Sequence, residues 1–86
     1  MKPCRWDPEQ NDTLRADLGV SFEGIVVAIE SDGLLDVLAH PDEVKYPRQR
    51  VLVVAYDSYA YLVPFIEEED YYFLKTIIPS RKATRD

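Results

Sequence analysis

The sequence has little of several residue types on which common kinds of functional site depend. Its 86 residues include one cysteine, one histidine and three glycines. The single Cys4 excludes an internal disulfide framework and a cysteine-based metal cluster. The lone His40 excludes a mechanism built on two histidines, and no glycine-rich phosphate loop is present. We therefore expect a protein with no metal and no cofactor.

Long apolar segments are also missing. No run approaches the roughly 18 residues that cross a bilayer, and residues 1–7 lack the apolar stretch of a signal peptide. These absences predict a cytoplasmic protein that does not enter a membrane. A chain of 86 residues has room for one core, so residues 1–86 are expected to form a single domain.

Acids outnumber bases, with sixteen Asp and Glu against ten Lys and Arg and a net charge of −6. Such a balance argues against a nucleic-acid partner. The charges are spread unevenly, however, because residues 1–44 carry ten acids and three bases while residues 45–86 carry six acids and seven bases. Four of those six acids stand together, so the rest of the second half can offer a cationic surface. Scattered charge without a binding role fits the same numbers.

Two helices are expected in the first third of the chain. Asp7, followed by proline, is typical of an N-cap, with Gln10 placed for a capping box. The helix would cover residues 8–17 and end at Gly19. Ser21 predicts a second N-cap, and the apolar residues that follow it recur at helical spacing.

After Gly33, which is expected to stop the second helix, the pattern changes to strands. Runs rich in β-branched and aromatic residues predict strands at 34–39, 49–56, 59–66 and 71–78, and residues 4–6 fit a short N-terminal strand. Pro64 requires a bulge or a local edge in its strand. Because the connections are short, the strands must pair antiparallel. The predicted fold is α+β, with two N-terminal helices packed on a four- to five-stranded antiparallel sheet in a two-layer sandwich.

Cations and one histidine are the side chains that could carry chemistry. On or around the strands lie His40, Lys45, Arg48, Arg50, Lys75, Arg81, Lys82 and Arg85. For any one of them, a solvated surface residue is the more common outcome. Together they suit RNA cleavage, because guanidinium groups bind the charged oxygens of a phosphorane and attack by the 2′-hydroxyl needs no metal. His40 is the candidate proton-transfer group, and a surface loop histidine is the alternative.

Two further features have both a functional and a structural interpretation. Six tyrosines could stack on bases, but packing of a small sheet is the preferred interpretation. The run Glu67-Glu68-Glu69-Asp70 could contact a basic partner, but a solvated turn is the preferred interpretation.

Both ends of the chain carry motifs that resemble those of a known family. The opening contains Trp6-Asp7-Pro8-Glu9, Asn11 and Gly19-Val20-Ser21-Phe22-Glu23, and the ending is Ile77-Ile78-Pro79-Ser80-Arg81-Lys82-Ala83-Thr84-Arg85. The first set resembles the opening of BrnT-type toxins, and the second resembles their closing Ser-Ala-Arg-Lys-Ala-Thr segment. The order of elements agrees over the whole chain, whereas the middle matches only in pattern. Leu18 stands where family members commonly have histidine.

The resemblance implies a ribonuclease toxin of a type II toxin–antitoxin pair, with a RelE-like fold and RNA as substrate. An antitoxin encoded nearby, often one with a ribbon-helix-helix part, would neutralise it in a hetero-oligomer, and the apolar strand around Leu62–Ile66 would suit docking to that partner. Arg81 and Lys82 correspond to the closing basic motif, and Arg48 and Arg50 lie where the family tends to carry basic residues. The expected catalytic residues are His40, Arg48, Arg50 and Arg81, and the expected substrate-binding residues are Lys45, Lys75, Lys82 and Arg85. The alternative is a non-enzymatic protein-binding module that keeps the same fold.

Overall fold

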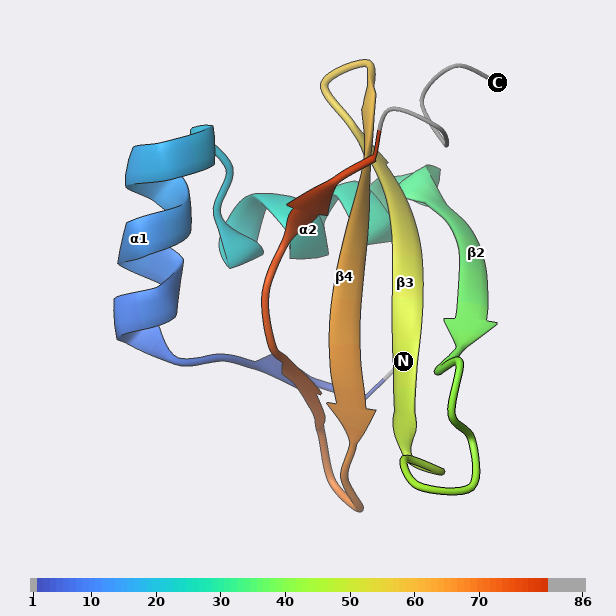
Figure 1. Ribbon diagram of the computed structural model, residues 1–86. Helices are drawn as coiled ribbons and strands as arrows, with labels where there is room; N and C mark the ends of the chain where they lie inside the picture. Colours follow the sequence, from blue (N-terminus) through green and yellow to red (C-terminus); the bar gives the residue numbers. More distant parts are fainter. Residues whose placement is uncertain (1, 81–86) are drawn as a thin grey trace.

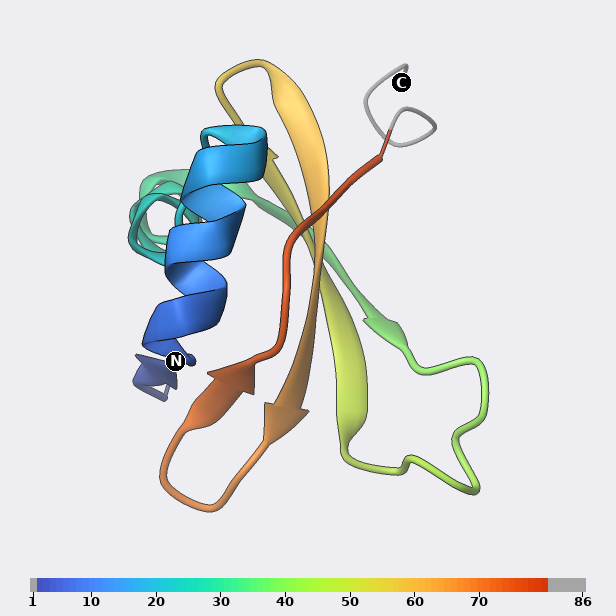
Figure 2. The ribbon, with the colours of Figure 1, turned by 60° about the vertical axis from the view of Figure 1, so that its left-hand side comes forward.

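Two helices precede most of the strands in the chain, which a computed structural model describes over residues 2–80 (Figure 1). The elements in chain order are β1 (Cys4–Arg5), α1 (Pro8–Leu18), α2 (Phe22–Ala28), the π-helical turn η1 (Ile29–Gly33), β2 (Leu34–Ala39), β3 (Gln49–Tyr56), β4 (Tyr59–Glu67), β5 (Tyr72–Leu74) and β6 (Ile78–Pro79). Both helices lie on the same side of the sheet (Figure 2). The α+β class is therefore confirmed. Among residues 2–80, no helix has the length and apolar character needed to span a membrane.

The sheet contains six strands in the order β1-β5-β4-β3-β2, with β6 beside β4. The pairs β2–β3, β3–β4, β4–β5 and β4–β6 are antiparallel, as expected from their short connections. The pair β1–β5 is parallel, with Cys4 opposite Tyr72. The predicted count of four to five strands was too low, and the prediction that all strands pair antiparallel was wrong for β1 alone among the described strands. β1 joins β5 across more than sixty residues of chain, so no short turn dictates its direction.

The helix ends follow the caps that the sequence predicts. The Asp7 side chain accepts from the Glu9 N–H at 3.0 Å, Gly19 ends α1 with a left-handed φ of 70°, and the Ser21 side chain accepts from the Gly24 N–H at 3.1 Å. The capping box at Gln10 was wrong, because the Gln10 amide donates to Thr76 Oγ1 at 3.0 Å instead. That bond fastens α1 to the segment between β5 and β6.

Gly33 acts through its small size rather than by stopping a regular helix. Regular α-helix ends at Ala28, and Asp32 takes the left-handed φ of 67° that turns the chain. A Cβ at Gly33 would lie 2.6 Å from the carbonyl oxygen of Ala28 and 2.7 Å from that of Ala55. Only glycine can stand this close to β3, so Gly33 determines where β2 begins.

The expected strand 71–78 is divided into β5 and β6, and Pro64 faces the interruption. Pro64 is opposite Val51 of β3, while its carbonyl accepts from the Lys75 N–H at 2.8 Å on the other side. The N–H that proline lacks would point to that same side, toward the interval between β5 and β6. The local edge predicted at Pro64 is confirmed. On the side where proline lacks an N–H donor, Pro64 has no partner residue in β5 or β6.

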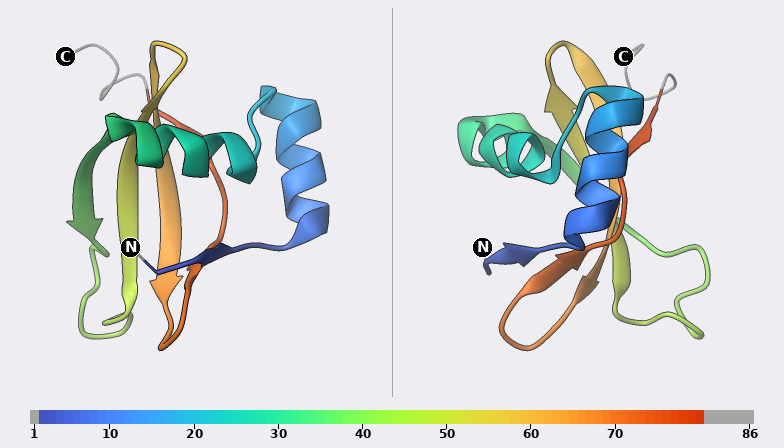
Figure 3. Two further views of the ribbon diagram at one scale, coloured as in Figure 1. Left: turned by 180° about the vertical axis from the view of Figure 1, so that it is seen from behind. Right: turned by 90° about the vertical axis from the view of Figure 1, so that its left-hand side faces the viewer.

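The core lies between the sheet and the helices. Its fully buried side chains are Phe22, Ile25, Val54, Val63 and Leu74. Phe22 stacks on Trp6 with ring centroids 5.5 Å apart, and α2 crosses the sheet over β3 and β4 (Figure 3). Each of these apolar side chains contributes roughly 1.5–3 kcal/mol by leaving water.

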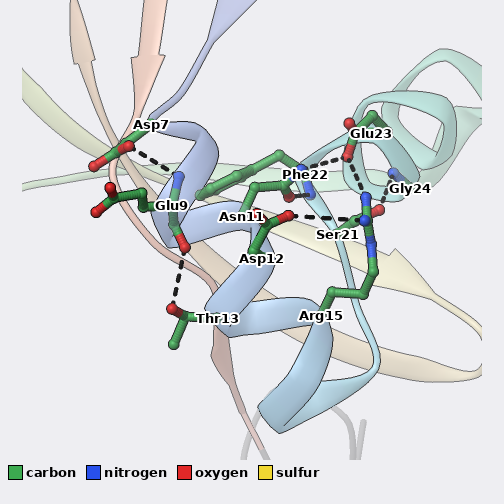
Figure 4. Close-up of polar contacts among 10 residues, drawn as sticks. All are labelled: Asp7, Glu9, Asn11, Asp12, Thr13, Arg15, Ser21, Phe22, Glu23 and Gly24. Atoms are coloured by element: carbon green, nitrogen blue, oxygen red, sulfur yellow. Dashed lines mark hydrogen bonds and ion pairs between the residues drawn. The ribbon is translucent and has the colours of Figure 1, made fainter.

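A buried carboxamide joins α1 to the start of α2 (Figure 4). Asn11 is 5% exposed, and its Oδ1 accepts from the Phe22 N–H at 2.8 Å. Its Nδ2 donates to Glu23 Oε1 at 2.7 Å, and Arg15 Nη2 lies 3.4 Å from the same oxygen. These bonds hold the first turn of α2 where Phe22 enters the core.

Asn11→Ala is expected to lower the free energy of unfolding by about 1–3 kcal/mol, because the buried Phe22 N–H would lose its acceptor. Urea unfolding followed by circular dichroism measures the change. Asp17→Ala, on an exposed position of the same helix, is the control and should stay within about 0.5 kcal/mol of wild type. An Asn11→Ala protein as stable as this control would contradict the role given to the carboxamide.

Glu23 should make stability depend on pH. The hydrogen bond from Asn11, with smaller contributions from the backbone and from Arg15, lowers the pKa of the Glu23 carboxyl. A lowered folded pKa means that the ionised group stabilises the fold at neutral pH and that this contribution is lost as pH falls through that pKa. Glu23→Gln should therefore lose less stability than wild type between neutral and acid pH, as measured by urea midpoints. Parallel curves for the two proteins would contradict this account.

Candidate functional site

Three cations gather at the end of the sheet where β3 begins and β4 ends. Lys2, Arg48 and Arg50 line an open hollow of about 500 Å³ together with Pro47, Glu67, Glu68 and Glu69. The backbone creates this cluster, because the Glu67 N–H donates to the carbonyl of Arg48 at 3.1 Å. The β3–β4 register thus places the first cations of β3 beside the acids that end β4.

The cations of this hollow are paired with carboxylates. Arg50 bonds Glu67, Lys2 Nζ lies 3.1 Å from Glu67 Oε2, and Arg48 Nη1 lies 3.2 Å from Glu68 Oε1. The acidic run is therefore neither a purely solvated turn nor a surface left free for a basic partner. Two of its four members neutralise the candidate phosphate-binding groups.

The pairing at Arg48 is weak enough for a ligand to displace. Its side chain is 70% exposed, and an exposed ion pair contributes only about 0–1 kcal/mol. Arg50 is held more firmly, because its guanidinium also lies 5.5 Å from the ring centroid of Phe65. Arg48 is thus the cation that an incoming phosphate can recruit at least cost.

His40 and Lys45 lie in the β2–β3 loop, residues 40–48, which projects away from the helices (Figure 2). The His40 ring contacts Tyr46 with centroids 4.5 Å apart, and Lys45 Nζ lies 5.4 Å from the same ring. Lys45, Tyr46 and Arg48 line a second hollow of about 150 Å³. Arg48 therefore borders both hollows and connects the loop to the cation cluster.

The loop geometry restricts the chemistry of His40. Its Nδ1 accepts from the Asp42 N–H at 2.9 Å, so the ring proton of the neutral imidazole lies on Nε2. His40 can donate a hydrogen bond from Nε2 in this arrangement. It can act as a base through Nδ1, or as an acid from the doubly protonated ring, only after the Asp42 N–H is released.

Of the remaining candidates, Lys75 lines neither hollow. Lys75 is exposed between β5 and β6, and its backbone N–H bonds Pro64. Arg81, Lys82 and Arg85 lie outside the described residues. Lys2 is the cation that the sequence reasoning missed, because no local pattern signals that the chain start meets the end of β4.

The tyrosines and the cysteine are mainly packing groups. Tyr56, Tyr61 and Tyr72 pack against the core, and burial raises the pKa of the Tyr61 hydroxyl. Burial also raises the pKa of the half-buried Cys4 thiol, with Glu30 adding to the effect. A thiol of raised pKa is a poor nucleophile. Among residues 2–80, no three His, Cys, Asp or Glu side chains are grouped to hold a metal ion.

Comparison with models of protein families gives no match for this chain, and comparisons with curated proteins and with solved structures give none either.

Release of Arg48 from its carboxylate should strengthen phosphate binding. Glu68→Gln is expected to raise affinity for a short single-stranded RNA by up to about fivefold at low salt, the equivalent of one exposed ion pair. Fluorescence anisotropy with a labelled oligonucleotide measures the change. Glu69→Gln alters the net charge equally in the same turn but breaks none of the ion pairs described above, so it is the matched control. Equal gains for the two variants would show that only overall charge matters.

Proposed function

We propose that the protein is a metal-independent endoribonuclease of a toxin–antitoxin pair, with a RelE-like fold. One observation carries the proposal: two arginines and a lysine line a single open hollow at the end of the sheet where the histidine-bearing loop begins and ends. The resemblance of the closing basic segment to that of BrnT-type toxins supports the same activity. The overall charge of −6 does not oppose it, because binding of phosphate depends on the local field.

The proposed reaction needs charge stabilisation and proton transfer. The 2′-hydroxyl oxygen attacks the adjacent phosphorus, the bond to the 5′-oxygen breaks, and a cyclic phosphate and a 5′-hydroxyl end result. One proton passes from the 2′-hydroxyl to solvent water, and one reaches the departing 5′-oxygen. Arg48 and Arg50 stabilise the charge on the phosphorane. His40, protonated on both ring nitrogens once the Asp42 N–H is released, donates a proton from Nε2 to the leaving oxygen and takes one back from solvent.

The other candidate residues are proposed to bind RNA away from the reacting phosphate. Lys45 lies in the loop beside Arg48 and would hold a flanking phosphate. Arg81, Lys82 and Arg85 are included because of the closing motif, and Lys75 because of its exposed position between β5 and β6. In this proposal the antitoxin neutralises the enzyme by covering the loop and the hollow.

The arginine variants test the activity. Arg48→Ala is expected to lower cleavage of RNA by about 10²–10³-fold, the usual loss for one transition-state donor, and Arg81→Ala is expected to abolish toxicity without unfolding the protein. The readouts are growth and total RNA after induced expression, with and without the neighbouring reading frame, and cleavage of a labelled oligonucleotide in vitro.

Arg15→Ala is the matched control, since Arg15 is also an exposed arginine with carboxylate partners but lies on α1. It should cleave RNA like wild type. Normal growth and intact RNA from a folded wild-type protein would overturn the nuclease proposal.

A second candidate function is a non-enzymatic module that binds a protein. The charge balance of the hollow favours it, because three cations there face three glutamates. The exposed apolar strand β2 also favours it. A wild-type protein that binds the product of the neighbouring reading frame and leaves RNA intact would establish this candidate instead.

A further inference from the structure

Strand β2 is an uncovered edge of the sheet. All six of its residues are exposed, and within residues 2–80 no strand lies beyond it. Its large apolar side chains are Leu34, Leu35, Val37 and Leu38, which are 36%, 57%, 43% and 43% exposed. Proteins usually protect an edge strand with lysine, proline or a bulge that bends it away. Here the bulge lies at the very start of β2, and Asp36 is the only charge in the strand.

The apolar strand around Leu62–Ile66, expected to be the docking surface, does not have this character. It belongs to β4, which pairs with β3 on one side and with β5 and β6 on the other. Its backbone is therefore already engaged, and Val63 and Phe65 are buried. The expectation was wrong because the order of strands in the sheet cannot be read from their hydrophobicity.

The backbone of β2 offers outward hydrogen-bonding groups. The His40 N–H donates to the carbonyl of Gln49 on β3, and the register is continuous from Asp36 to Ala39. By alternation, the N–H and C=O groups of Val37 and Ala39 point away from β3. The Val37 N–H is bonded at 2.8 Å by the carboxylate of Asp36. A neighbouring strand can replace that local bond with a ladder bond.

Negative charge surrounds this edge. Exposed acids stand before, within and after β2, at Glu30, Asp32, Asp36, Asp42 and Glu43. None of the five forms an ion pair with another residue of the described chain. A second copy paired through β2 about a two-fold axis would bring these acids against their own equivalents. Charge therefore disfavours self-association and favours a basic partner.

We infer that β2 accepts an extended segment of a partner protein, in which apolar residues alternate with lysine or arginine, as an added strand of the sheet. The apolar residues would cover the exposed leucines and valine, and the basic residues would meet the surrounding acids. Identifying this partner with the antitoxin rests on the proposed function, whereas the docking itself does not. A strand that continues past Ala39 would reach the loop that carries His40, so the same contact could block the candidate site.

The probe is a blocked ten-residue peptide of alternating valine and lysine, titrated into the ¹⁵N-labelled full chain at low salt. Amide shifts should be confined to β2 and its flanks, with intermolecular contacts from the outward positions Val37 and Ala39. Val37→Pro removes one outward N–H without touching the bonds to β3, and it should weaken binding by about tenfold. The valine–glutamate peptide should not bind.

Charge reversal gives the matched comparison. Asp36→Lys should weaken binding of the lysine peptide, because it replaces one of the five acids around β2 with a cation, whereas Asp17→Lys, the same change on α1, should behave like wild type. Absence of shifts at β2, equal effects of the two lysine variants, or dimerisation of the chain through β2 would each overturn the inference. RNA cleavage by the unliganded protein is measured separately, so loss of the nuclease proposal and loss of this inference give different results.

Discussion

The structure depends on the hydrogen bonds of one buried side chain, Asn11. Its carboxamide satisfies the first free N–H of α2 and holds the carboxylate of Glu23, so the two helices meet at a defined angle. That contact places Phe22 against Trp6 and brings α2 across the sheet. A helix of seven residues is too short to be stable alone. Its position, and hence the whole helical layer, relies on this connection.

Positive and negative charge gather at different places on the molecule. Lys2, Arg48 and Arg50 gather where β3 begins, and their pairing with Glu67 and Glu68 orients them. Five exposed acids without ion pairs to the described residues lie in or beside β2. An anionic polymer would be repelled from the second surface. The net charge of −6 is therefore no measure of the local charge at the hollow where RNA is proposed to bind.

Local features of the fold were predictable and long-range ones were not. Asp7, Gly19 and Ser21 mark helix ends because capping involves neighbours two to four residues away. The parallel strand β1, the division of 71–78 and the pairing of Arg48 with Glu68 depend on register between distant segments. For the candidate site, this means that the residue types were foreseen but their carboxylate partners and Lys2 were not.

The likeness to the BrnT-type toxins supports different conclusions at the two ends of the chain. In the opening segment, Asp7, Asn11, Gly19, Ser21 and Glu23 all have structural tasks as caps or as members of the helix junction. A likeness there supports a shared helical layer and carries no information about catalysis. In the proposed ribonuclease, the chemistry would come from the loop of residues 40–48, the hollow beside it and the closing basic motif. A change of activity in this chain would therefore leave the opening motif intact, because the fold would still require it.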